Sequence, residues 1–301
     1  MSEGARSQLI GKKCVICCEN APIKNSHVLP RFVFRWMIKT GGSQFLRHAG
    51  APNKRVQDGF KYPLLCGDCE TRTSLVEKHF AEHIFKPSVE NGALPKRTGR
   101  KEYDFVCLNH LRSMAYFSIE GKMDKISNQE VEMRFRAIDT IGAYLNGETH
   151  SAVGLKFYLL PFGVGELSDL RGAPPNWHRY IRRHTEFDTI GNDTGSLFGS
   201  YYKLGPWLSF CLIKNEGQRW LGADINVTRS RWDRRITLPP SILDFLFDRA
   251  ETSKRIMHSM SDKQKKVVQE AILSGDILTE GRPMFDAIMA DLDAFGPQAF
   301  E

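Results

Sequence analysis

The chain has 301 residues, enough for two domains, and its 41% hydrophobic and 11% aromatic content is typical of a packed globular protein. No run of about 18 apolar residues occurs, and Met1 to Lys13 lack the apolar core of a signal peptide, so we expect a cytoplasmic protein without a membrane span. The formal net charge is +7, and residues 1–90 hold 14 Lys or Arg against 8 Asp or Glu. This uneven charge favours a polyanionic partner for the N-terminal part.

Two CxxC pairs occur in the first third of the chain, Cys14 with Cys17 and Cys66 with Cys69. Each CxxC turn can direct two sulfurs at one metal ion, and two such turns supply the four thiolates of a closed structural zinc site. The odd total of seven cysteines favours metal ligands over a disulfide framework. We therefore predict one structural zinc ion bound by these cysteines, with Cys18 as an alternative ligand to Cys17.

A helix is expected after the first pair. Residues 14–29 are predicted to form the first zinc knuckle and a small hairpin, and Pro30 suits the start of a helix over residues 31–40. Arg31, Arg35 and Lys39 recur at i, i+4 and i+8 on one face of that helix. This stripe is either the solvated side of a buried helix or a ridge that contacts phosphates.

The next segment leads to the second CxxC pair. Residues 43–60 are predicted to be a loop that exposes Lys54 and Arg55 as further nucleic-acid contacts. The second pair runs directly into a helical pattern that continues to about Phe85, and Pro87 and Asn91-Gly92 are expected to stop it. The metal ion is thus predicted to tie the N-terminal knuckle to the start of this helix.

Between the pairs lies Ser26-His27-Val28-Leu29-Pro30, and the second pair is preceded by Leu64. A CxxC pair, a polar residue with His, two apolar residues and Pro, and then Leu-x-Cys-x-x-Cys entering a helix resemble the zinc-stapled HNH nucleases (ββα-metal, treble-clef). The resemblance covers the first third of the chain. It implies that Ser26 and Glu70 hold a catalytic Mg²⁺ or Mn²⁺ and that His27 is the general base.

The chemistry of these residue types suits phosphodiester hydrolysis. A His near neutral pKa can accept the proton of an attacking water, and a metal-bound carboxylate stabilises the charge that develops on phosphorus. Alternatively, His27 bonds the knuckle backbone, and Glu70 is an acid stabilised by the helix N-terminus. Arg72 is predicted to contact a phosphate or solvent, and Glu77, seven residues after Glu70, to pair with a Lys rather than to support the metal.

The basic segment from Lys96 to Lys101 is the predicted domain boundary, which gives a zinc-stapled module over residues 1–95 and a second domain over 96–301. Cys107 and Cys211 lie in apolar stretches and are predicted to be core thiols. The order of helices, strands and helices indicates an α+β fold. The expected elements are helices near 104–120 and 127–146, strands near 152–161, 196–213 and 219–227, an irregular segment over 165–195, and helices near 240–258, 262–274 and 283–295.

Two basic-aromatic clusters occur in the second domain, residues 177–184 and 229–235. Arginines beside Trp or Tyr can hold phosphates and stack on bases, but they can equally form ion pairs inside the domain. The near-neutral charge of residues 91–301 favours the ion pairs.

Together these patterns predict a metal-dependent HNH-like endonuclease. We expect nucleic acid as its partner, DNA rather than RNA, and a second domain for targeting or for binding a protein partner. By analogy with nuclease modules attached to unique domains, antiphage defence is an expected setting. The alternative is a zinc-stapled module that binds nucleic acid or protein without catalysis.

Overall fold

The computed structural model describes residues 6–23, 26–41, 45–120, 126–161, 171–228, 230–231, 236–274 and 282–300. The architecture is α+β, as predicted. The helices are α1 (Arg31–Thr40), α2 (Gly67–Phe80), α3 (Lys86–Asn91), α4 (Arg100–Ile119), α5 (Asn128–Leu145), α6 (Trp177–Arg183), α7 (Pro240–His258), α8 (Asp262–Ser274) and α9 (Pro283–Phe295), with shorter turns η1 (Ser7–Leu9), η2 (Ala81–Phe85) and η4 (Gly296–Phe300). The strands are β1 (Leu46–His48), β2 (Ala51–Val56), β3 (Arg97–Thr98), β4 (Lys156–Leu160), β5 (Thr185–Gly191), β6 (Leu197–Leu204), β7 (Trp207–Asn215), β8 (Asp224–Ile225) and β9 (Ser230–Arg231).

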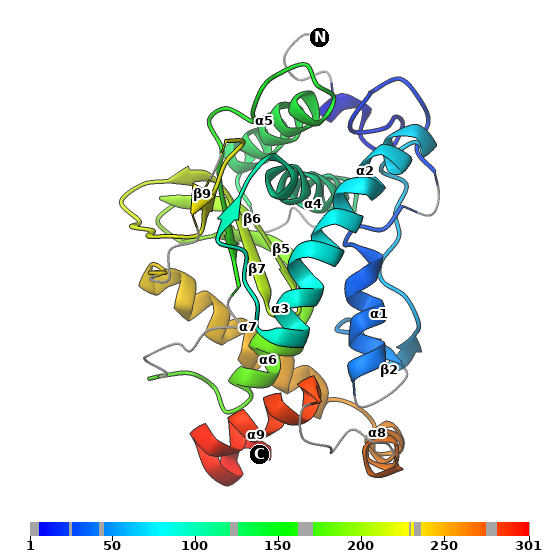
Figure 1. Cartoon of the computed structure of the whole chain (residues 1–301), viewed down its shortest axis with the longest axis vertical. Coiled ribbons are helices and arrows are strands. Elements are labelled where there is room, and N and C mark those ends of the chain that lie inside the picture. Colours follow the sequence, from blue (N-terminus) through cyan, green and yellow to red (C-terminus); the bar gives the residue numbers. More distant parts are fainter. Residues whose placement is uncertain are drawn as a thin grey trace.

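An antiparallel sheet in the order β5-β6-β7-β4-β8 forms the centre of the molecule (Figure 1). Strand β6 is buried along its whole length and β4 and β7 over most of theirs, and since successive side chains point to opposite sides, both faces of these strands are covered. In β4, Phe157 and Leu159 join the core cluster that contains α4 and α5, whereas Tyr158 and Leu160 join the cluster that contains α6 and α7. The sheet is therefore the middle layer between two layers of helices.

The strand-like run over residues 196–213 is a hairpin, not a single strand. Gly205 makes the turn between β6 and β7 with φ +57°, a conformation that favours glycine. A Cβ there would lie 2.7 Å from Cζ3 of Trp36, so the turn also needs glycine to let α1 approach. The turn thus brings the sheet against the N-terminal region.

The segment expected to be irregular, 165–195, contains α6 and β5 within its described part. In α6, the buried side chains Trp177, Tyr180 and Ile181 recur at i, i+3 and i+4. The arginines between them give the same stretch the appearance of a nucleic-acid cluster. Because α6 has only seven residues and mixes polar with apolar side chains, its helical periodicity is not recognisable in the sequence.

Helix α2 continues without a break through η2 into α3, and Pro87 does not end it. The η2 segment is a π-helical turn, in which the backbone N–H of Lys86 donates to the carbonyl of Ala81. Such a turn shifts the hydrogen-bond ladder just before a proline that has no N–H to donate. Gly92, with φ +63°, ends the helix, at the Asn91-Gly92 stop that the sequence also indicated.

One apolar core connects the N-terminal region to the sheet. Phe80 of α2 stacks on Phe105 of α4 with ring centroids 3.8 Å apart, and its edge meets Trp207 of β7. Cys107 and Cys211 are buried in this core, as expected. Among the described residues, no helix combines the length and the apolar character that crossing a membrane requires.

Candidate functional site: a four-cysteine centre next to Ser26, His27 and Glu70

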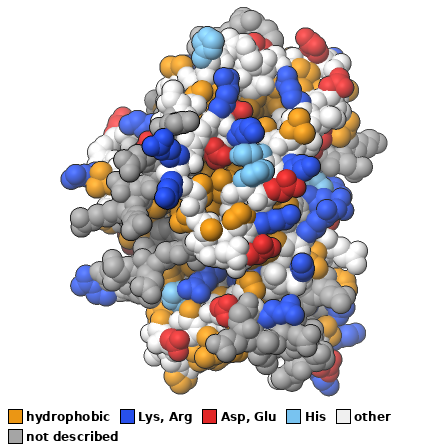
Figure 2. Space-filling model, in the orientation of Figure 1, with side chains coloured by type: hydrophobic (Ala, Val, Ile, Leu, Met, Phe, Trp, Pro, Cys, Tyr) orange, Lys and Arg blue, Asp and Glu red, His pale blue; other side chains and the backbone are white. Residues whose placement is uncertain are grey.

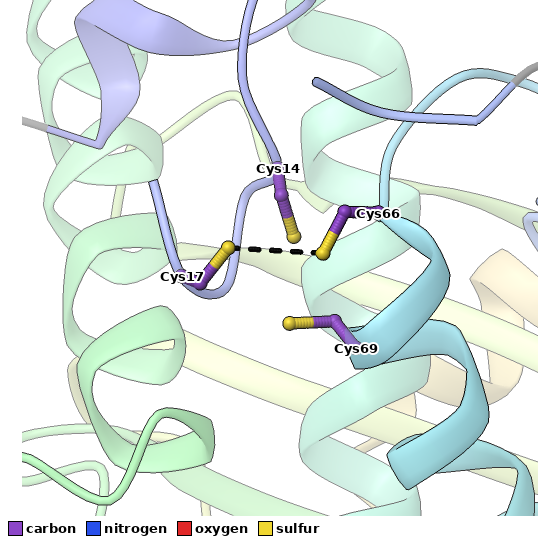
Figure 3. A group of neighbouring side chains, drawn as sticks. All are labelled: Cys14, Cys17, Cys66 and Cys69. Atoms are coloured by element: carbon purple, nitrogen blue, oxygen red, sulfur yellow. Dashed lines mark hydrogen bonds between the residues drawn. The ribbon is translucent and has the colours of Figure 1, made fainter. Parts of the chain in front are cut away.

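The four predicted cysteines converge on one point (Figure 3). Cys14 and Cys17 come from the N-terminal knuckle, Cys66 precedes α2, and Cys69 lies in its first turn. The sulfurs all lie within 4.8 Å of one another, and those of Cys17 and Cys66 are 3.8 Å apart. A tetrahedral zinc ion with Zn–S bonds of about 2.3 Å needs sulfurs roughly 3.8 Å apart. The cluster could hold a zinc ion, and its donor set suits a closed structural site.

The surroundings of the cluster favour the ionised thiolate form more at Cys17 than at Cys14. Burial raises the pKa of Cys14, and it also works against the thiolate at Cys17, but backbone bonds from Asn20 and Glu19 bring the pKa of Cys17 down to about 7. Cys18 lies outside the cluster, with its pKa raised to about 11 by burial, so the alternative of Cys18 as ligand is not what the structure shows. All of these cysteines are free thiols.

A short antiparallel bridge precedes α2. His27 pairs with Lys61, the N–H of Val28 donates to the carbonyl of Phe60, and that of Tyr62 donates to the carbonyl of Ser26. With the zinc-linked helix that follows, these two short segments form a ββα arrangement. The backbone of His27 is therefore fixed by pairing with the segment that leads into the second knuckle.

The His27 side chain lies against a carboxylate. Its Nε2 lies 3.0 Å from Oδ1 of Asp58, and the side chain is 15% exposed. Burial works against the charge of Asp58, but Lys61, 2.8 Å away, His27 and the N–H of Gly59 lower its pKa to about 2. Asp58 is thus ionised, and its contact with Nε2 orients the ring.

Glu70 and Ser26 are brought together as the sequence predicted, but a cation that it did not predict joins them. Oε2 of Glu70 accepts bonds from the Ser26 hydroxyl at 2.9 Å and from Nη2 of Arg112 at 3.0 Å. Arg112 also pairs with Glu77, so Glu77 bonds to an arginine of α4 rather than to a lysine. Oε1 of Glu70 has no hydrogen-bond partner among the described residues, and the side chain is 29% exposed.

The predicted nucleic-acid contacts lie mostly on the surface. Arg31, Arg35 and Lys39 are exposed on α1, and Figure 2 shows basic side chains on the part of this face that α1 occupies. Residues 45–60 are not a loop throughout, because β1 and β2 form a hairpin there that exposes Lys54 and Arg55. Arg72 is exposed, and its Nη2 lies 3.6 Å from the sulfur of Cys69, where it can support a metal-bound thiolate.

Three residues around this site were missed by the sequence reasoning: Asp58, Arg112 and Arg47. Asp58 falls in a stretch expected to be a loop, and nothing local ties it to His27. Arg112 could have been recognised from the sequence, because it is a cation at a core position of an apolar helix. A buried cation of this kind needs a carboxylate partner. Arg47 lies directly opposite Arg55 in the hairpin, which only the strand register reveals.

The first basic-aromatic cluster serves the fold, as the charge balance suggested. Arg179 donates through Nε to Asp291 of α9 at 2.6 Å, and Arg183 lies 4.3 Å over the Trp36 ring while donating to Thr40. Of the second cluster, residues 229 and 232–235 lie outside the described residues.

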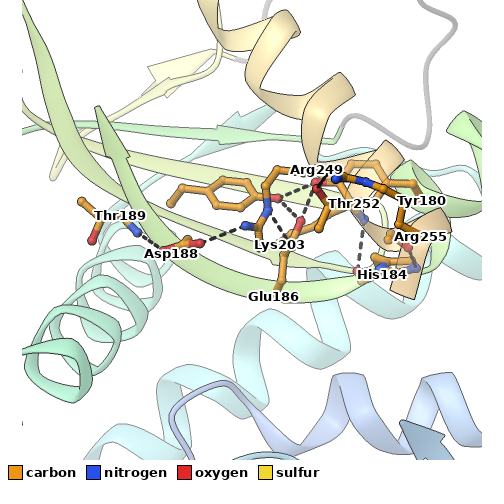
Figure 4. A network of polar contacts seen from close by, with 11 residues as sticks. Tyr180, His184, Glu186, Asp188, Thr189, Lys203, Arg249, Thr252 and Arg255 are labelled. Atoms are coloured by element: carbon orange, nitrogen blue, oxygen red, sulfur yellow. Dashed lines mark hydrogen bonds and ion pairs between the residues drawn. The ribbon is translucent and has the colours of Figure 1, made fainter. Parts of the chain in front are cut away.

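A second polar network lies on the α7 side of the sheet (Figure 4). Glu186 accepts bonds from the hydroxyls of Tyr180 and Tyr201 and from Arg249, whose Nη2 is 2.7 Å away. Arg249 also reaches Asp188 at 3.0 Å. Arg249 of α7 thus bonds two carboxylates of β5, and the network ties α7 to the sheet.

Comparison of the chain with protein-family models, with curated proteins and with solved structures finds no match. The functional interpretation therefore depends on the geometry of the site.

Proposed function

We propose that the chain is a zinc-stapled, HNH-like endonuclease that hydrolyses phosphodiester bonds in nucleic acid. The observation that carries the proposal is the ββα arrangement: His27 in an antiparallel bridge to Lys61, followed by a helix that starts at the four-cysteine centre and presents Glu70 to Ser26. A zinc ion bound by the cysteines would fix this arrangement without an open coordination position, so it would be structural.

In this proposal His27 is the general base. Asp58 bonds Nε2 and leaves Nδ1 to take the proton of the attacking water. The ionised carboxylate then stabilises the imidazolium that forms, in the way an acidic partner supports a catalytic histidine. The nearby Lys61 keeps Asp58 ionised and is a candidate contact to the phosphate.

Glu70 is the residue that would hold a catalytic Mg²⁺ or Mn²⁺. Ser26 and Arg112 both bond Oε2, which orients the carboxylate and leaves Oε1 for an ion. Mg²⁺ commonly binds through one or two carboxylates with waters and substrate phosphates, so one available oxygen fits this ion. The ion would supply charge stabilisation at the scissile phosphate.

A second candidate function is binding without catalysis, and Arg112 is the observation that favours it. Its guanidinium already pairs with both Glu70 and Glu77, and it is 1% exposed. Among the described residues, the four cysteines are the one group in which three or more potential ligands converge. In this alternative the module binds nucleic acid or protein, and the Arg112 contacts only tie α2 to α4.

The deciding experiment is cleavage of plasmid DNA and single-stranded RNA with Mg²⁺ or Mn²⁺ by wild type, His27→Ala and Glu70→Ala. Removal of the general base in His27→Ala is expected to lower the cleavage rate at least ~100-fold. The matched control is His150→Ala, an exposed histidine beyond the C-terminal end of α5. Zinc content is measured in each variant, because a variant that loses zinc reports on folding.

Two results would count against the proposal. A wild-type protein that carries zinc and binds nucleic acid but cuts neither substrate would support the binding alternative. Full activity in His27→Ala would place the base elsewhere in the chain. The cytoplasmic location, the preference for DNA, a protein partner for residues 96–301 and a role in antiphage defence stay predictions.

A further inference from the structure

Two arginines face each other across the β1–β2 hairpin. Arg47 and Arg55 are directly paired in the antiparallel register, between the pairs Leu46–Val56 and His48–Ala51. Like charges at directly opposite positions destabilise a strand pair. The arrangement therefore opposes hairpin formation unless something between the two side chains compensates the charge.

No carboxylate in the described part of the chain forms an ion pair with either arginine. Arg47 is held by neutral acceptors, the carbonyl of Pro52 at 2.9 Å and Oε1 of Gln264 at 3.0 Å, and Arg55 lies 5.2 Å over the Phe45 ring. The pKa of Arg47 is lowered, first by partial burial and then by the charge of Arg55. Both guanidiniums are thus positioned, and their charge is uncompensated.

The hairpin is anchored on α8 at the far end of the sequence. Oδ1 of Asn53 accepts a bond from the N–H of Ser261, next to the bond between Arg47 and Gln264. Lys54 on β2 and Lys263 on α8 are exposed cations in the same neighbourhood. Asp262, next to Ser261, is fully exposed and lies 3.9 Å from Lys265, and in the described part of the chain it forms no ion pair with either arginine.

The hairpin also lies next to the proposed catalytic histidine. The His48 ring meets the Phe60 ring edge-on, with centroids 4.3 Å apart, and the carbonyl of Phe60 accepts the bond from Val28. His48 and Phe60 thereby connect the arginine pair to the backbone bridge that holds His27. A polyanion bound at the hairpin is held close to the segment where hydrolysis is proposed.

We propose that Arg47 and Arg55 form a phosphate clamp that binds the phosphodiester backbone of nucleic acid. A phosphate placed between the guanidiniums removes their repulsion and accepts bonds from both forks, which suit phosphate geometry. The clamp rests on the proposed function in one respect only: both proposals take nucleic acid as the ligand. It adds β1 and α8 to the surface that holds that substrate.

The test is fluorescence anisotropy with a short labelled DNA duplex and a labelled single-stranded RNA, between about 50 and 200 mM salt. The double variant Arg47→Gln/Arg55→Gln is compared with wild type and with Lys101→Gln/Arg219→Gln, two exposed cations on α4 and after β7. The clamp variant is expected to bind at least about 10-fold more weakly, with the log–log salt slope reduced by about 2, one unit for each lost phosphate contact. The control variant is expected to keep the wild-type slope.

A thermal melt separates a binding role from a structural one. Because the substitution relieves repulsion, the clamp variant without nucleic acid is expected to melt at the wild-type temperature or above it. A lower melting temperature, an unchanged salt slope, or an equal loss of affinity in the control variant would overturn the clamp. Binding of wild type to anionic lipid vesicles but to neither nucleic acid would overturn it as well.

The clamp and the nuclease can fail separately. Weakened binding in the clamp variant, together with a wild type that cuts nothing, supports the clamp and rejects the nuclease. Cleavage that depends on His27, together with an unchanged salt slope in the clamp variant, supports the nuclease and rejects the clamp.

Discussion

The arginines that pack α6 and α7 and those of the β1–β2 hairpin differ in their partners. On the side of the sheet covered by α6 and α7, Arg179 and Arg249 are bound to the carboxylates of Asp291 and Glu186. On the hairpin, Arg47 and Arg55 have no carboxylate partner in the described residues and face each other. The charges of Arg179 and Arg249 are thus neutralised within the fold, whereas those of Arg47 and Arg55 stay available to a ligand.

This difference shows why a basic-aromatic cluster in a sequence is weak evidence for nucleic-acid binding. The cluster over residues 177–184 looks the more typical, with Trp, Tyr and several arginines, yet α6 buries its aromatic rings and uses its arginines for tertiary contacts. The hairpin shows little clustering in sequence, because its two arginines are eight residues apart and meet only through strand pairing. Uncompensated charge in three dimensions is the better indicator.

The largest expected effect comes from removing the metal that would hold the N-terminal region. We predict about one zinc per chain, and a Cys66→Ser/Cys69→Ser variant that binds none, with a loss of apparent stability on the order of 10 kcal/mol. Elemental analysis and hydrogen exchange measure the two quantities. A metal-free wild type that is fully folded, or full zinc occupancy in the double variant, would contradict the zinc centre.

Next in size is the buried network of the sheet region. Arg249→Met leaves the carboxylate of Glu186 without its cation, and breaking such a pair costs about 3–5 kcal/mol of unfolding free energy. Burial raises the pKa of Glu186, but Arg249 and the hydroxyls of Tyr180 and Tyr201 together bring it below its ordinary value. This stability is therefore present above about pH 4 and lost as pH falls through the folded pKa. Chemical denaturation at several pH values is the measurement. Nucleic-acid affinity at neutral pH should stay unchanged wherever the variant is folded.

The double variant Glu186→Gln/Arg249→Met is the control for the network. It removes the more buried carboxylate together with its cation and is expected to recover part of the loss, because the one carboxylate of this pair of contacts that stays unpaired, Asp188, is 37% exposed. A double variant less stable than Arg249→Met alone would show that the network stabilises through packing and not through charge compensation.

The smallest expected effect on stability, with a clear effect on binding, belongs to α1. Neutralising Arg31, Arg35 and Lys39 together should change the unfolding free energy by less than about 0.5 kcal/mol per residue, since all three are exposed. The same variant should weaken nucleic-acid binding and flatten the salt slope by up to about 1 unit per residue. Anisotropy across a salt series measures this. An unchanged slope would assign α1 to a solvated face that takes no part in binding.

Helices with a clear apolar periodicity or with a proline at their boundary were predictable from the sequence. Helices α1, α7, α8 and α9 have the predicted bounds, since Pro30, Pro239-Pro240 and Pro283 mark three of the starts. The four cysteines were predictable as a set because CxxC spacing determines which sulfurs can converge. The resemblance named Ser26 and Glu70 as ligands of one catalytic metal; their direct hydrogen bond was not predicted.

What could not be predicted depends on contacts between distant residues. Arg112 reaches Glu70 only because α4 packs along α2, 42 residues later in the chain. Asp58 meets His27 through a bridge of single residues, too short to leave a strand pattern in the sequence. The predicted strand over 219–227 is reduced to the two residues of β8, since only Asp224 and Ile225 find a partner at the sheet edge.

Helix α2 begins at the cysteine centre and ends with Phe80 stacked on Phe105. Loss of the zinc ion that we predict at this centre would free the beginning of the helix whose last side chain fills the shared core, and the loosened chain would expose both apolar surface and peptide bonds. In a cell poor in zinc, newly made copies would be recognised by chaperones and cleaved by proteases before they mature. The amount of the protein, and not only its activity, would then follow the zinc supply.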